Sequence, residues 1–228
     1  MRGPAKKGAA SAGARVVELH RPRDTRDRLL QVAQTLFAER GFRGASLRDI
    51  ARRIGIQAPS LLHHFPSKQQ LYLAVLDRIF EGLEDAAGAL LVGRESYQDR
   101  MRNAIAAAID HIARRPDAVR IIWQEMSDES GVGRQLIKRR VPPLNSMALN
   151  FIFRGQREGE FRTEIDPFHF LLSLNSITLG YFTTAATVRR LWNINMLEPQ
   201  LIDSRKREVI DMVERTLFIP QPAPPSLS

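Results

Sequence analysis

The sequence predicts an all-α protein made of a small N-terminal domain and a larger C-terminal domain. Apolar residues recur at helical spacing through most of the chain, and Gly and Pro interrupt that pattern repeatedly. Of the 228 residues, 43% are hydrophobic, which is enough to form a core in both domains. We place the small domain at residues 24–71 and the larger one at 72–219.

The small domain is expected to hold three short helices. The first covers about 25–40 and ends at a glycine. Ser46 begins the second helix, where Asp49 stands three residues on in the arrangement of a capping box. Gly55 ends that helix after about two turns. The third spans about 58–64, between a proline in its first turn and another just after its end.

A capped second helix, a glycine turn and a short third helix together predict a helix-turn-helix at about residues 46–65. The excess charge of the chain lies in the same region. Residues 1–71 contain 14 Lys and Arg against 5 Asp and Glu, whereas residues 72–228 contain 20 of each kind. A polyanion is therefore attracted to one end of the molecule, and the pattern favours binding of double-stranded DNA. The competing interpretation is a helical bundle with a solvated basic face.

Composition excludes several other classes of site. The chain has no cysteine, so disulfides, thiolate metal sites and cysteine nucleophiles are absent. Residues 1–23 lack the apolar run of a secretory signal and read as a disordered basic arm, and 220–228 read as a loose Pro-rich tail. We expect the protein to be cytoplasmic. Because no enzyme motif is present, we also expect no cofactor, no metal site and no catalytic residues.

The stretch from Thr25 to Leu76 strongly resembles the DNA-binding domain of the tetracycline-repressor (TetR) family, on the segments LFAERGF, SLRDIARRIGI and SLLHHFPSK. The resemblance implies a homodimer with a variable C-terminal domain for ligand binding and dimerisation. It also implies a regulator that a small effector controls, usually a repressor. By the same resemblance, the residues that contact DNA are Ser46, Arg48, Gln57, Ala58, Pro59, Ser60, Leu62, His63 and Lys68.

Two of these residues depart from the family pattern. Leu62 replaces a tyrosine that commonly meets the DNA backbone, so one hydroxyl contact is missing. Gln57 replaces a common Ser or Thr cap, and its amide is suited to pairing with adenine. Both departures affect the set of contacts rather than the function.

The larger domain shows a helical pattern with little motif content. We expect helices at about 67–91, 97–114 and 117–128, then 134 onward, 144–158, 167 onward and 203–217. The break before 144 is placed at Pro142 and Pro143, which are expected to end or kink the helix that contains them.

One long uncharged stretch, 170–188, approaches the length of a membrane span. It carries several Ser and Thr residues, and we interpret it as a helix buried in a core or between subunits. Its small residues, together with the stripe Val209, Met212, Val213 and Leu217 of the last helix, predict a symmetric dimer surface. An intrachain core is the alternative.

An apolar effector pocket is predicted among the middle helices, with Ser176 as a polar fixing point. Its proposed lining is Met101, Ile105, Met126, Met147, Phe151, Phe168 and Leu172. The alternative is that these residues only fill a core. The function predicted from the whole chain is a repressor that an apolar or amphipathic effector releases from a palindromic operator. The alternatives are a ligand-binding protein or enzyme that has lost DNA binding, and a DNA-binding protein without a ligand.

Overall fold

The computed structural model describes residues 22–91, 94–128 and 131–219. Within these ranges the regular structure is helical, apart from one isolated bridge between Phe161 and Phe218, so the predicted all-α fold class is confirmed. The expected basic arm, up to residue 21, and the expected Pro-rich tail lie outside the described residues.

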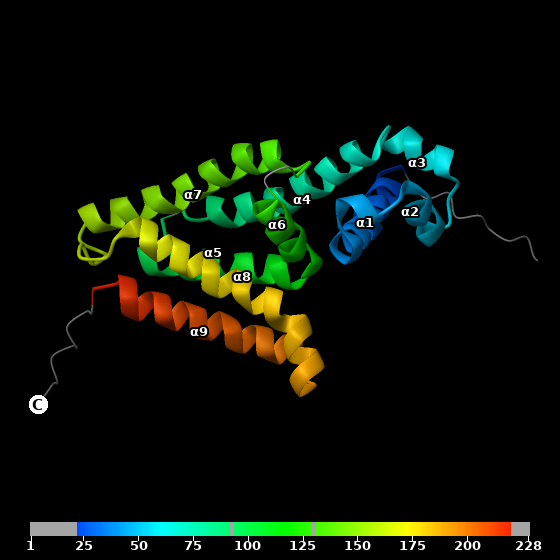
Figure 1. Cartoon of the computed structure of the whole chain (residues 1–228). Coiled ribbons are helices and arrows are strands. Elements are labelled where there is room, and N and C mark those ends of the chain that lie inside the picture. The colour runs from blue at the N-terminus through cyan, green and yellow to red at the C-terminus, as the bar shows by residue number, and fades with distance from the viewer. Residues whose placement is uncertain (1–21, 92–93, 129–130, 220–228) are drawn as a thin grey trace, which may run out of the picture.

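The helices follow one another with short connections (Figure 1). They are α1 (Pro22–Gly44), α2 (Leu47–Ile54), α3 (Ala58–His64), α4 (Lys68–Gly88), α5 (Tyr97–Ala113), α6 (Asp117–Ser127), α7 (Arg134–Arg157), α8 (Pro167–Trp192) and α9 (Pro199–Leu217). In Figure 1, α1 to α3 cluster at one end of the molecule, and α4 runs from that cluster into the larger domain.

Side-chain caps explain where four of these helices begin. The side chains of Ser46, Ser67, Ser96 and Asp166 each accept a hydrogen bond from the backbone N–H three residues later, at 2.8 to 3.1 Å. Each bond satisfies a donor that has no partner inside its helix. The cap predicted at Ser46 is therefore confirmed.

Two hydrophobic cores hold the molecule together. The first joins the small domain to α4, α6 and the start of α7, and the second joins α5, α7, α8 and α9. The helix α4 contributes to both cores, because its Leu71 and Tyr72 are buried in the first and its Leu83 packs against both. The position of α4 makes it the structural link between the two domains.

The first helix is longer than its pattern predicts. It begins at Pro22, so the last two residues of the expected arm are helical, and its assignment continues to Gly44. Gly41 interrupts the helical geometry with φ of 69° and ψ of 174°, a backbone conformation that glycine adopts without a steric cost. Gly41 thus ends the first helical segment, as predicted, and the residues up to Gly44 form a short second segment beyond a kink.

The two adjacent prolines do not end their helix, so the predicted break is wrong. Pro142 and Pro143 lie inside α7, which continues from Arg134 to Arg157. Both prolines are exposed, and the carbonyl groups that they leave without a donor belong to the exposed residues Lys138 and Arg139. Water can hydrate those carbonyls, so the cost of each missing hydrogen bond is small at this position.

The two helices predicted to form the dimer surface, α8 and α9, pack against the protomer in different ways. Only Pro167, Leu171, Phe182 and Ala185 of α8 are buried, so most of its uncharged surface is open in a single chain. In α9 the residues Val209, Val213 and Leu217 of the predicted stripe lie in the second core. The stripe predicted to meet a partner therefore faces the protomer's own core, and only its Met212 is exposed. None of the helices in the described ranges is long and apolar enough to cross a membrane.

Candidate nucleic-acid interface

The third helix is held by one face and exposed on the other. Leu61 is fully buried and Phe65, which caps the helix C-terminus, is 4% exposed. Ile50 and Ala51 of α2 are buried in the same core, so the two helices are fixed to each other through their inner sides. The opposite side of α3 is left free to enter a groove of DNA.

Gln57 is the N-cap residue just before α3, and its side chain makes no capping contact. Its backbone carbonyl accepts the N–H of Ser60 at 3.0 Å, while its side chain makes no capping hydrogen bond. The residue is exposed. An amide that is not engaged in the fold has both its donor and its acceptor available for the edge of a base, which is the geometry that adenine requires.

At the start of α2, the Ser46 side chain is hydrogen-bonded in the helix cap, whereas the Arg48 side chain has no ion pair in the described residues. The Ser46 hydroxyl accepts the N–H of Asp49 and donates to the Asp49 carboxylate at 2.8 Å, so its hydrogen-bonding capacity serves the helix cap. Asp49 in turn pairs with Arg40 and Arg52, at 3.3 and 2.7 Å. Arg48 is exposed and has no ion pair within the described part of the chain. It is the member of this group with a charge free for phosphate.

Lys68 has a structural role that the sequence did not indicate. Its ammonium group donates to the carbonyl oxygen of Ala45 at 3.1 Å and lies 4.5 Å from the ring centre of Phe42. A second carbonyl, that of Arg43, lies at 3.5 Å. These contacts hold the turn between α1 and α2 against the start of α4, so a contact from Lys68 to phosphate would come from an ammonium that is already positioned.

The remaining predicted residues lie along the outer side of α3. Pro59, Ser60, Leu62 and His63 are exposed, and Ala58 is half-buried. Leu62 keeps 42% of its surface in solvent, so the side chain that departs from the family pattern points away from the core. None of the nine residues is buried, and which of them contact DNA stays a prediction.

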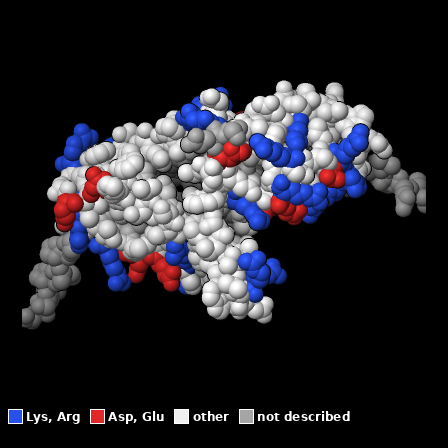
Figure 2. Space-filling model, viewed as in Figure 1, with Lys and Arg blue, Asp and Glu red and all other residues white. Residues whose placement is uncertain are grey.

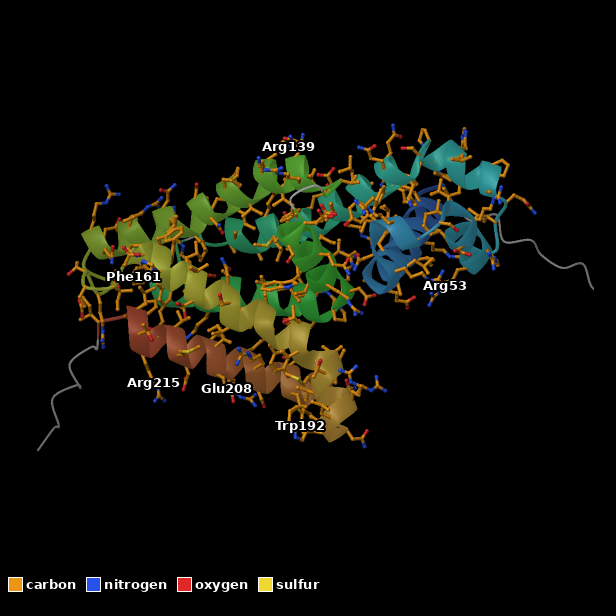
Figure 3. The ribbon with its side chains drawn as sticks, in the orientation of Figure 1. Arg53, Arg139, Phe161, Trp192, Glu208 and Arg215 are labelled. Carbon is orange, nitrogen blue, oxygen red and sulfur yellow. The ribbon has the colours of Figure 1, made fainter. Side chains whose placement is uncertain are left out.

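The charge on this surface is predominantly positive. Figure 2 shows Lys and Arg gathered over the domain formed by α1 to α3, with a few acidic residues among them. Arg53 projects from α2 at this end of the molecule (Figure 3), where it lies 3.5 Å from Glu39. Such a surface attracts phosphate through displacement of condensed counterions, without regard to base sequence.

The structure separates the eight residues predicted for an effector pocket. Met101, Ile105 and Phe151 are buried together in the second core, and Met147 is half-buried. In contrast, the other four residues are exposed: Met126, Phe168, Leu172 and Ser176.

Two hollows lie elsewhere on the larger domain. One, of about 700 Å³, opens beside the end of α7 and includes Arg154 and Arg157 in its lining. The other, of about 320 Å³, lies between α8 and α9 and includes Phe170 and Met212. Neither hollow is lined by any of the eight residues.

The histidines do not form a metal site in the described ranges, where no group of His, Asp and Glu has suitable geometry. His111 packs between α4 and α5 against Gly82. Burial lowers the pKa of His111, and the nearby charge of Arg115 lowers it further. The imidazole is therefore neutral at physiological pH and belongs to the packing of the two helices.

The arrangement described so far is that of a helix-turn-helix DNA-binding domain attached to a helical domain. Known families match both parts. The family described as "Bacterial regulatory proteins, tetR family" matches residues 29–75, and "Tetracyclin repressor-like, C-terminal domain" matches 98–213. The chain belongs to the TetR family of transcriptional regulators.

Individual relatives agree with that assignment. The chain is 31% identical over 146 residues to the HTH-type transcriptional repressor KstR2 of Mycolicibacterium smegmatis, covering 64% of this chain and 71% of the relative. It is 36% identical over 104 residues to the HTH-type transcriptional activator FasR of the same organism, covering 45% and 48%. These relatives are regulators of transcription, so the enzyme alternative is set aside.

The fold has a counterpart among solved structures. The ketosteroid transcriptional regulator KstR2 of Mycobacterium tuberculosis aligns with a TM-score of 0.65, covering 88% of this chain and 98% of that one. At 22% identity the likeness concerns the fold. It supports the placement of the small domain beside a larger all-helical domain.

Proposed function

We propose that this TetR-family regulator is a homodimeric repressor that binds a palindromic operator and leaves it when a small amphipathic effector occupies the larger domain. The observation that carries the proposal is the outer side of α3. Gln57 there has an exposed amide that the fold does not use, on a helix whose inner side is buried. Repression rather than activation is supported by KstR2, whereas FasR is named an activator.

A dimer is needed because one short helix reads only a few base pairs. Two recognition helices must sit about 34–36 Å apart to enter successive major grooves. The exposed uncharged surface of α8 is the surface best suited to hold two copies together, since most of it lacks a partner in the protomer. The link α4 would carry any change in the larger domain to the spacing of the two small domains.

Fluorescence anisotropy with the DNA that flanks the protein's own gene tests this function. The wild-type chain should bind a palindromic segment more tightly than shuffled DNA of the same composition, with an affinity that falls as salt rises. The variant Gln57→Ala should lose about 1–3 kcal/mol of preference at one base pair in each half-site. Arg48→Ala is the matched control, because loss of a phosphate contact weakens binding to all sequences alike.

Two outcomes would count against the proposal. Equal affinity for palindromic and shuffled DNA would contradict a specific operator. Uniform weakening by Gln57→Ala would show that this residue does not read a base.

A second candidate is a DNA-binding protein without an effector. The packing around Phe151 favours it, because this side chain is fully buried among Tyr97, Phe161 and Ile152. The two candidates predict the same DNA binding and differ only in whether any small molecule lowers it.

A further inference from the structure

Arg100 is a buried cation that no carboxylate neutralises. It lies in the first turn of α5, where only 7% of its surface is exposed. One terminal nitrogen donates to the carbonyl oxygen of Leu90, beyond the end of α4, and the Nε is buried without a hydrogen-bond partner. No ion pair between described residues includes it. A charge removed from water in this way destabilises the protein unless an anion or a full set of acceptors compensates.

The walls around this guanidinium are aromatic and apolar. Its central carbon lies 5.4 Å from the ring centre of Tyr97 and 5.0 Å from that of Phe151. Phe161, labelled in Figure 3 near the end of α7, packs against both rings at 5.3 and 5.6 Å. Cation–π contacts of this kind stabilise a buried guanidinium only in part.

The nearest acidic residues are committed to other partners. Asp99 accepts hydrogen bonds from the Ser96 hydroxyl and from Arg102. Arg102 also binds Glu214 on α9. Glu158 accepts the hydroxyl of Tyr97 at 2.9 Å. The carboxylates around the start of α5 are therefore engaged, and none is directed at Arg100.

A second guanidinium strengthens the positive field at the same place. Arg154 lies on α7 and lines the hollow of about 700 Å³ beside its end. Burial, followed by the hydrogen bond to Glu158, raises the pKa of Tyr97, and the charges of Arg154 and Arg100 both oppose that rise. Both guanidinium groups therefore act on the same phenol, from α7 and from α5.

We propose that Arg100 binds the anionic group of the effector, which is an amphipathic carboxylate with an apolar body. This inference rests on the proposed function and names the chemical class of the effector. The planar fork of a guanidinium matches the two oxygens of a carboxylate, and the buried Nε–H provides a donor that the fold leaves unused. The apolar body would lie against the second core, where Met101 and Ile105 are buried beside Phe151.

Tyr97 is the wall that must move to admit such a molecule. It is half-buried, and among the described residues its hydroxyl bonds to Glu158, which is itself exposed. A swing of this ring would open a path between α5 and α7 to Arg100. The carboxylate would then meet one fixed cation in an apolar environment, where a charged hydrogen bond is stronger than in water.

The test measures binding of octanoate and dodecanoate, with octanol and dodecanol as uncharged analogues, to the full chain by isothermal titration calorimetry. We expect the wild-type protein to bind a carboxylate about tenfold or more tightly than the matching alcohol. Arg100→Met keeps the volume and removes the charge, so it should lose at least about tenfold in carboxylate affinity while alcohol affinity changes less than about twofold. The control is Arg102→Met, which removes a neighbouring paired arginine and should leave the carboxylate preference intact.

The inference is overturned if the wild-type protein binds neither carboxylate, or binds carboxylate and alcohol equally. It is also overturned if Arg100→Met binds the carboxylate as the wild type does. Should Arg100→Met fail to fold, Arg100→Lys and the wild-type comparison of acid with alcohol still decide the question. DNA affinity, measured separately without ligand, tests the proposed function. Intact DNA binding without a carboxylate preference would refute this inference alone.

Discussion

Tyr72 and Glu125 share a buried hydrogen bond at the boundary between the DNA-binding domain and the larger domain. The Tyr72 hydroxyl donates to one carboxylate oxygen of Glu125 at 2.6 Å, and the other oxygen accepts the N–H of Gly133 at 2.7 Å. The ring of Tyr72 packs edge-on against Phe37 and Phe42 of α1, with centres 4.8 and 5.1 Å apart. One carboxylate thus connects α4, the end of α6 and the start of α7.

We predict that Tyr72→Phe destabilises the protein by about 1–3 kcal/mol, because it leaves a buried carboxylate oxygen without a donor. The ring packing against α1 is unchanged by this substitution, so the loss reports the hydrogen bond rather than a cavity. Urea unfolding followed by circular dichroism gives the difference. A free energy of unfolding equal to that of the wild type would mean that water replaces the hydroxyl.

The same bond predicts a loss of stability in alkali. Burial, followed by the hydrogen bond and charge of Glu125, raises the pKa of Tyr72 well above its usual value. The unfolded chain releases this proton above about pH 10, whereas the folded chain retains it. Stability from this group is therefore complete below pH 10 and falls as the pH rises further. The fall in unfolding temperature between about pH 9 and about pH 11 should be smaller for Tyr72→Phe than for the wild type.

Two glycines of α4 should respond in opposite ways to the same substitution. A methyl group on Gly82 would lie 1.9 Å from the Cε1 of His111, whereas one on Gly88 would meet no atom within 4 Å. We expect Gly82→Ala to destabilise by about 1–3 kcal/mol through overpacking. Gly88→Ala should be neutral or stabilise by up to about 1 kcal/mol through helix propensity. Equal effects in thermal unfolding would contradict the close packing of α4 and α5.

Substitutions of Arg48 and Lys68 should distinguish the loss of a DNA contact from a loss of protein stability. Arg48 is exposed and has no ion pair in the described ranges, so Arg48→Ala should weaken DNA binding and lower its salt dependence by about one counterion. Its unfolding temperature should not change. Lys68→Ala should lower that temperature as well, because it removes the donor that holds the carbonyl of Ala45. Unaltered stability in Lys68→Ala would assign this residue to DNA alone.

Local signals predicted the DNA-binding domain well. The caps at Ser46 and Ser67, the positive φ of Gly55 and the short α3 all depend on residues within one or two turns of one another. Such local signals can be recognised in the sequence without knowledge of the tertiary fold. The helices of the small domain could therefore be placed by residue number, whereas the engagement of Lys68 with the α1–α2 turn depends on a contact across 23 residues.

The larger domain was predicted less completely, because periodicity gives the apolar side of a helix and not its neighbour. Val209 and Val213 form the expected stripe, yet they pack inside the protomer. Phe151 is fully buried, so its truncation to alanine would cost about 3–5 kcal/mol and could not probe effector binding cleanly. Arg100 reads in sequence as one more charge on a polar helix start, and only the packing of α5 on α7 shows that it is buried.

Three hydroxyl groups on the exposed surface of α8 are already hydrogen-bonded to the backbone of their own helix. The hydroxyls of Thr183 and Thr184 donate to the carbonyl of Gly180 at 3.0 and 2.8 Å, and Ser176 donates to the carbonyl of Leu172 at 2.8 Å. Covering these side chains would therefore leave no hydroxyl donor unmet. Gly180 lies among them, with no atom within 4 Å of the position that a Cβ would take.

We therefore predict that Gly180→Leu weakens the dimer by about tenfold or more, because a large side chain would hold the two copies of α8 apart. The protomer itself should be as stable as the wild type or more so, since the position is open and leucine is a better helix former than glycine. Sedimentation equilibrium measures the dissociation constant, and Gly180→Ala serves as a milder control. Operator affinity should fall in step with the loss of dimer, because each protomer supplies one recognition helix. If Gly180→Leu leaves both the dimer and the operator affinity unchanged, the two copies must meet through a surface other than α8.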